Sequence, residues 1–116
     1  MNLQDLRTML DYHYWARDRL LEAIDALTPD QLTRDLGSSF KSVRDTVAHT
    51  YAAEWAWYQR WLGQSPKALL PYDQFPDVAS IRNARDFDSE IRKVLLMFAS
   101  NRVRDTVCMV FFPRLP

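Results

Sequence analysis

Apolar residues recur at steps of three and four, or multiples of these, along the first 27 residues, and this spacing constrains the fold most. On a helix such residues form a single stripe, so the sequence predicts a helix over residues 3–27. His13 and Arg17 fall on the same line, which places a polar interruption in the middle of the stripe. The apolar members of the stripe are Leu3, Leu6, Leu10, Leu20, Ile24 and Leu27.

A second helix is predicted over residues 43–62. Ser42 followed by Asp45 is typical of a helix N-terminus, and Gly63 suits the left-handed residue that follows a helix end. His49 lies roughly opposite the broad apolar face of this helix, beside Ala53. That apolar face consists of Val47, Tyr51, Trp55, Tyr58 and Leu62.

The rest of the chain also reads as helix and loop. Thr28 and Gln31 predict a short capped turn after the first helix, and three prolines between residues 63 and 77 predict a crossing loop. A third helix is expected over residues 78–100. Residues 107–112 form a continuous apolar hexapeptide, either a short buried helix or a strand-like tail. Because no other strand is predicted to pair with it, the expected fold class is all-α.

Composition excludes several kinds of protein. A chain of 116 residues fits one domain. With a net charge of zero, there is no general attraction to nucleic acid or to an anionic membrane. No apolar run is long enough to span a membrane or to act as a signal peptide, so a cytoplasmic location is expected. The single cysteine, Cys108, excludes an intramolecular disulfide and a cysteine-rich metal site.

Several short segments, in this order and spacing, resemble the DinB/YfiT-like superfamily. The resemblance covers roughly residues 3–100. It rests on Tyr-His-Tyr-Trp-Ala at 12–16 with Arg-Leu-Leu at 19–21, on Asp-Thr-Val-Ala-His at 45–49 with Glu-Trp at 54–55 and Arg-Trp at 60–61, and on Leu-Pro at 70–71 and Phe-Pro-Asp at 75–77.

The resemblance implies a four-helix bundle with one long crossover, and a metalloenzyme site. Members of this family hold a divalent metal, often zinc or nickel, on three histidines. One histidine comes from the second helix and two come from a His-x-x-x-His pair on the fourth. Some members are thiol S-transferases that use low-molecular-weight thiols, others are hydrolases, and many pair as homodimers. His49 matches the second-helix metal ligand.

The chain departs from this pattern after about residue 101. It contains no His-x-x-x-His and no histidine after His49. We therefore expect an incomplete four-helix bundle, with three main helices and a short C-terminal tail, in a single domain over residues 1–116 that is truncated or altered near its end. Because a catalytic zinc needs three protein ligands and an open position, His49 alone predicts little tight metal binding by an isolated chain.

Two other side chains are candidates to join His49. His13 supplies a second metal-ligating nitrogen if the first two helices face each other. Its position is equally typical of a core histidine that is held by hydrogen bonds. Glu54 carries a carboxylate, yet on a helix it points about 140° away from His49.

Weaker candidates lie nearer the C-terminus. Asp86, Asp88 and Glu90 form an acidic cluster that is either a cation site or a solvated helix face. Cys108 is either a nucleophile or a small buried apolar residue, and the second reading is favoured because no base lies near it in the sequence.

The sequence leaves two functions open. In the first, the chain is a metal-dependent transferase or hydrolase whose missing ligands come from another chain. In the second, it is a non-catalytic helical remnant or an oligomerising binding module. Three helices of a four-helix bundle would expose an apolar seam, and such a seam drives association.

Overall fold

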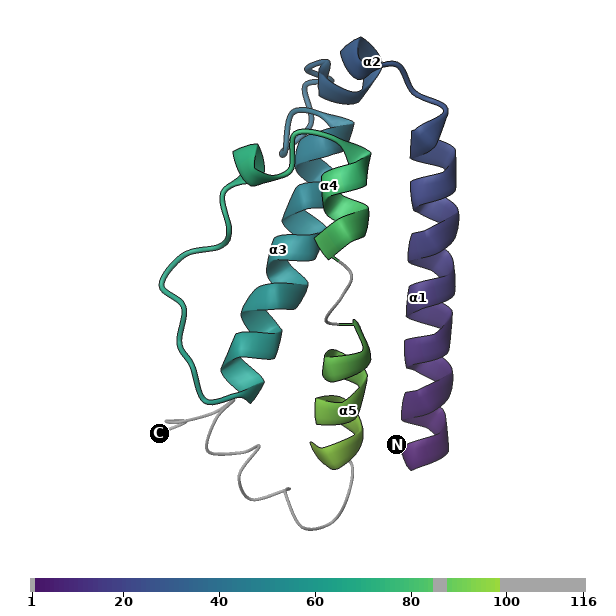
Figure 1. Ribbon diagram of the computed structural model, residues 1–116, viewed down its shortest axis with the longest axis vertical. Coiled ribbons are helices and arrows are strands. Elements are labelled where there is room, and N and C mark those ends of the chain that lie inside the picture. The colour runs from purple at the N-terminus through teal and green to yellow at the C-terminus, as the bar shows by residue number, and fades with distance from the viewer. Residues whose placement is uncertain (1, 85–87, 99–116) are drawn as a thin grey trace.

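The computed structural model describes residues 2–84 and 88–98, and these residues are largely helical. The first helix, α1 (Leu3–Asp25), leads through the short α2 (Pro29–Thr33) to α3 (Val43–Trp61), which runs antiparallel to α1 (Figure 1). No strand occurs within the described ranges, where Ser38 and Lys41 form one isolated bridge. The all-α prediction is confirmed.

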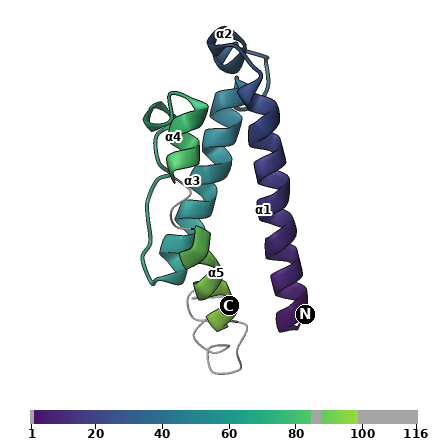
Figure 2. The ribbon, with the colours of Figure 1, turned by 45° about the vertical axis from the view of Figure 1, so that its right-hand side comes forward.

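A long connection links α3 to the last helices. It runs back along α3, passes through the 3-10 turn η1 (Tyr72–Gln74), and leads to α4 (Val78–Asn83) and α5 (Asp88–Phe98) (Figures 1 and 2). Because the connection returns to the starting end of α3, α4 and α5 run in the same direction as α3. The apolar hexapeptide at 107–112 lies outside the described residues, and truncation near residue 101 stays a prediction.

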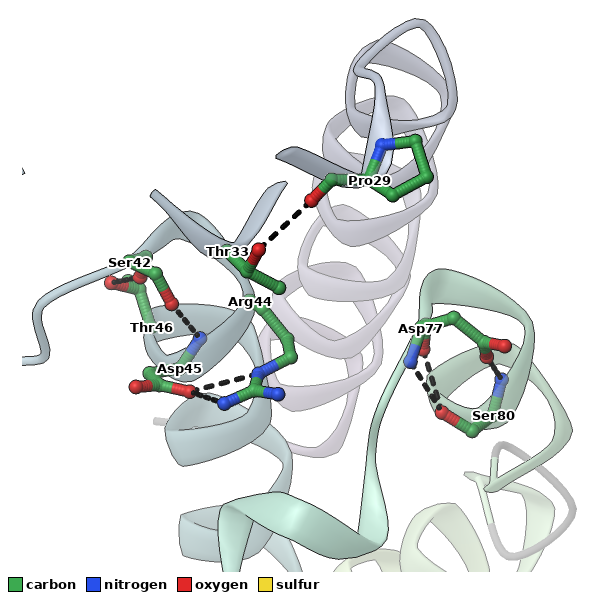
Figure 3. A network of polar contacts seen from close by, with 8 residues as sticks. All are labelled: Pro29, Thr33, Ser42, Arg44, Asp45, Thr46, Asp77 and Ser80. Atoms are coloured by element: carbon green, nitrogen blue, oxygen red, sulfur yellow. Dashed lines mark hydrogen bonds and ion pairs between the residues drawn. The ribbon is translucent and has the colours of Figure 1, made fainter. Parts of the chain in front are cut away.

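Side-chain caps fix where the helices begin, as Figure 3 shows for α3 and α4. The Ser42 hydroxyl accepts a hydrogen bond of 3.0 Å from the backbone N–H of Asp45. The Asp77 carboxylate accepts one of 2.8 Å from the N–H of Ser80. Each bond satisfies a backbone donor that has no partner within the helix. The start of α3 predicted at Ser42 is confirmed.

Two other local predictions are also confirmed. Thr28 and Gln31 form a reciprocal capping box at the start of α2. Gly63, two residues after the end of α3, has a φ of 83°. A side chain disfavours that backbone conformation, so glycine is the natural residue there.

The buried stripe of α1 differs from the predicted one at two leucines, Leu20 and Leu3. Leu21 is fully buried and half of Leu20 is exposed, so Leu21 takes the place assigned to Leu20. Leu3 is also exposed. Leu20 and Leu21 both fit a spacing of three and four, and the packing of the neighbouring helices decides which of the two is buried. The observed core stripe consists of Leu6, Leu10, Arg17, Leu21 and Ile24, and His13 lies on the same line but is exposed.

The predicted apolar face of α3 needs a similar correction. Its buried residues are Val47 and three alanines, Ala48, Ala52 and Ala56, whereas Leu62 is largely exposed. Alanines at intervals of four let neighbouring helices approach α3 closely. The larger aromatic side chains of α3 therefore lie to either side of the alanine line.

The single helix predicted over residues 78–100 is instead two helices. α4 ends at Asn83, where the backbone N–H of Ala84 bonds to the carbonyls of Arg82 and Ser80 in a tightened last turn. Asparagine is a weak helix former because its side chain competes for backbone hydrogen bonds. α5 then begins at Asp88.

The main core lies at the end of the molecule that carries α2. It joins α1, α2, α3 and α4 with Phe75 of the connection, and Phe75 and Ile81 are both nearly fully buried. The members of the core cluster are Leu21, Ile24, Leu32, Val47, Ala48, Phe75 and Ile81.

None of the helices in the described part of the chain has both the length and the apolar character that a membrane-crossing helix needs.

Candidate functional site

A cavity of about 640 Å³ opens between α1, α3 and α5, at the end away from the main core. Its walls are mainly apolar and aromatic. Both histidines of the chain line it, together with one carboxylate. The lining residues are Leu10, His13 and Tyr14 of α1, His49, Thr50, Ala53, Glu54, Trp57 and Trp61 of α3, and Ile91 of α5.

The α3 wall follows from helical spacing. His49, Ala53, Trp57 and Trp61 recur every four residues, so they lie along one side of the helix. Glu54 lies at the edge of this wall nearest α1. His49 and Glu54 therefore border one cavity although they diverge by about 140° around the helix.

Glu54 links α3 to the polar interruption of the α1 stripe. Its Oε1 lies 2.5 Å from His13 Nε2, and its Oε2 lies 4.0 Å from Arg17 Nη1. The Glu54 carboxylate and the Arg17 guanidinium are largely buried, whereas His13 is more exposed. Since a buried polar group is costly without a partner, the contact with Glu54 helps to explain why Arg17 is accepted within the core stripe.

Arginines contact the aromatic rings around the cavity. Arg17 and Arg92 lie 5.0 and 5.7 Å from the ring centroid of Tyr14. Arg92 Nη2 also lies 2.5 Å from Asp11 Oδ1, which connects α5 to α1. Arg60 lies 4.8 Å from the Trp57 ring centroid. These contacts hold the rings in place and add positive charge near an otherwise apolar wall.

The His49 ring also contacts two segments outside α3: the loop before that helix, through Phe40, and the long connection, through Tyr72. Its Nδ1 shares a hydrogen bond of 2.8 Å with the Tyr72 hydroxyl. Its ring stacks on Phe40, with the ring centroids 4.1 Å apart. A hydrogen bond at one imidazole nitrogen fixes the ring orientation, as in metal-ligating histidines, but it serves a structural histidine equally well.

The described residues do not fit a catalytic metal site. Among residues 2–84 and 88–98, no three histidine, cysteine, aspartate or glutamate side chains come together as ligands. His13 turns to Glu54 and His49 turns to Tyr72, so each imidazole has a different partner. The assignment of His49 as the metal ligand stays a prediction.

The acidic cluster near the C-terminus is not assembled as a site in the part of the chain that is described. Asp86 lies outside the described residues, as does Cys108. Glu90 is exposed and bonds Lys93 Nζ at 2.7 Å. That hydrogen bond and the carboxylate charge raise the pKa of Lys93. Glu90 therefore behaves as part of a solvated helix face.

Sequence reasoning missed the partners of both histidines. Glu54 is 41 residues from His13, and Tyr72 is 23 residues from His49. One signal was available for the first pair: His13 and Arg17, one turn apart within an apolar stripe, need an acidic partner on a facing helix. Nothing in the sequence singles out Tyr72.

Comparison with known families gives one match. The model of the DinB family matches residues 1–103. No curated protein and no solved structure matches the chain. The family match covers most of the chain and agrees with the all-α fold and the resemblance seen in the sequence. The chain belongs to the DinB family.

Proposed function

We propose that this chain binds a small, largely apolar molecule in the cavity between α1, α3 and α5. The observation that carries the proposal is the cavity itself, about 640 Å³ with aromatic walls and a single carboxylate. Small-molecule sites are of this size and combine an apolar lining with a few polar groups. The isolated chain would have little of the metal-dependent transferase or hydrolase activity that the family resemblance implies.

The preferred ligand follows from the lining. Trp57 and Trp61 offer flat apolar surfaces, and Ala53 leaves room between them and His49. The Glu54 carboxylate can accept a hydrogen bond from a ligand hydroxyl or amine, beside its contact with His13. An aromatic ring that carries one hydrogen-bond donor matches this arrangement.

The experiment uses 2-naphthol, which has one such ring system and one hydroxyl. The indole N–H signals of the tryptophans are followed by ¹⁵N NMR as 2-naphthol is added. Trp57 and Trp61 should shift with saturation, whereas Trp15, which is exposed on the far side of α1, should not. Equal shifts of all tryptophans, or no saturable shift, would refute the proposal.

A matched pair of variants locates the ligand. Ala53→Leu fills part of the cavity and should weaken 2-naphthol binding at least about tenfold, because an added side chain displaces the ligand or strains the wall. Ala79→Leu makes the same change at an exposed position of α4 and should leave binding unchanged. If both variants bind like the parent chain, the ligand lies elsewhere.

A second candidate function is metal-dependent thiol transfer or hydrolysis, with the remaining ligands supplied by another chain. The hydrogen bond between His49 and Tyr72 is compatible with it, because such a bond also orients metal-ligating imidazoles. Zinc and nickel are the metals to test, and a low-molecular-weight thiol is the expected co-substrate. Binding of either metal that His49→Ala abolishes would support this candidate, whereas binding unaffected by that change would exclude His49. A cytoplasmic location stays a prediction from the sequence.

A further inference from the structure

Three arginines lie against the aromatic rings that line the cavity, and one of them differs from the other two. Arg60 has no carboxylate partner in the described part of the chain, where its guanidinium lies 4.8 Å from the centroid of the Trp57 ring. Its positive charge is therefore not matched by a neighbouring acid. The two paired arginines are Arg17, which lies near Asp18 and Glu54, and Arg92, which pairs with Asp11.

Helical geometry places Arg60 on the cavity side of α3. Around the helix it falls between His49 and Ala53, both of which line the cavity. Trp57, the ring that Arg60 contacts, lines the cavity too but is 44% exposed, so it stands at the mouth. Arg60 is itself partly exposed. Its guanidinium therefore lies beside the mouth, where a bound molecule would enter.

Glu54 and Arg60 flank Trp57 on opposite sides. Each lies about 60° around α3 from Trp57, and they are separated by about 9 Å along the helix axis. A hydrogen-bond acceptor thus stands on one side of the aromatic wall and a cation on the other. A flat ring system with a hydroxyl at one end and a negative group at the other would meet both.

Building on the proposed function, we propose that the molecule bound in the cavity is an aromatic carboxylate whose negative group pairs with Arg60 at the mouth. The planar guanidinium presents N–H donors in the geometry that a carboxylate accepts. The whole chain has a net charge of zero, which gives no general attraction for anions. A preference for a carboxylate would thus have a local origin.

Arg60 also suits its place in the last turn of α3, since a cation stabilises the negative end of a helix dipole. That structural role would alter the stability of the helix, but it would not distinguish a carboxylic acid from its uncharged ester. The comparison of these two ligands therefore isolates the proposed ion pair.

The test compares 6-hydroxy-2-naphthoate with its methyl ester, which has the same ring system and hydroxyl but no charge. Near neutral pH, the indole N–H shifts of Trp57 and Trp61 give both dissociation constants. In the parent chain the acid should bind about fivefold more tightly than the ester, which is the upper range for an exposed ion pair. The preference should shrink at high salt, because exposed charges are screened.

Variants that change one charge locate the partner of the carboxylate. Arg60→Gln should make the acid bind no more tightly than the ester, with binding of the ester unchanged. Arg60→Lys retains the charge and should keep most of the preference. Arg34→Gln removes the same charge at an exposed position directly after α2, at the end away from the cavity, and should keep all of it.

The outcomes separate this proposal from the proposed function. Saturable but equal binding of acid and ester by the parent chain would overturn the assignment of a carboxylate while the cavity still binds an aromatic molecule. So would an equal effect of Arg60→Gln on the two ligands, or a loss of preference in Arg34→Gln. If neither ligand nor 2-naphthol gives a saturable shift, the proposed function itself fails.

Discussion

The strongest prediction concerns Glu54, which joins the polar interruption of α1 to α3. Glu54→Gln keeps the size of the side chain and an oxygen for His13, but it removes the charge that faces Arg17. The Glu54 and Arg17 side chains are only 18% and 14% exposed. The guanidinium would remain in a largely buried position without this carboxylate, keeping its 3.5 Å contact with Asp18 Oδ1.

The magnitude follows from that burial. Removing one partner of a fully buried ion pair costs about 3–5 kcal/mol, and an exposed pair contributes about 0.2–1 kcal/mol. Because the Arg17–Glu54 separation is a long 4.0 Å and Arg17 keeps its 3.5 Å contact with Asp18, we expect the free energy of unfolding to fall by roughly 1–2 kcal/mol. In a domain of this size that lowers Tm by about 4–8 °C.

The assay is thermal unfolding followed by circular dichroism, with Asp25→Asn as the matched control. Asp25 also pairs with an arginine on another helix, since its Oδ2 lies 2.5 Å from Arg82 Nη2, but those side chains are 53% and 30% exposed. Asp25→Asn should cost less than about 1 kcal/mol. Equal losses of Tm in the two variants would refute the reasoning, because burial would then make no difference.

Two further predictions test the packing and the caps by the same measurement. Leu21→Ala should destabilise the chain by about 3–5 kcal/mol and Leu20→Ala by less than about 1 kcal/mol, since only Leu21 is fully buried. Similar losses of stability in the two variants would mean that the buried stripe of α1 is wrongly assigned. Ser42→Ala removes a buried cap of α3 and should cost about 1–2 kcal/mol, more than Thr28→Ala at the exposed start of α2. A larger loss for Thr28→Ala would contradict this order.

The sequence predicted those features whose physical causes lie within a few residues of one another. Ser42 and Asp45 lie in the first turn of α3, and Gly63 follows the residue that caps its end, so propensity and capping chemistry decide where the helix begins and ends. The family was also recognisable from short segments in order. The fold class followed from helical spacing alone.

Features that depend on distant partners were predicted less well. Leu20 and Leu21 both continue a spacing of three and four, and only the helices packed against α1 decide which is buried. Glu54 was judged by its angle to His49 on one helix, although its actual partner lies on another. The sequence placed both histidines as candidates but could not show that each has its own partner.

The position of α3 has a consequence for how this protein can change over evolutionary time. The first half of α3 contributes Val47 and Ala48 to the main core, whereas its second half contributes Trp57 and Trp61 to the cavity. If the proposed ligand site exists, substitutions of these two tryptophans, which lie outside the main core, would alter which molecules fit while leaving that core unchanged. Ligand preference can therefore drift among relatives while the architecture is conserved.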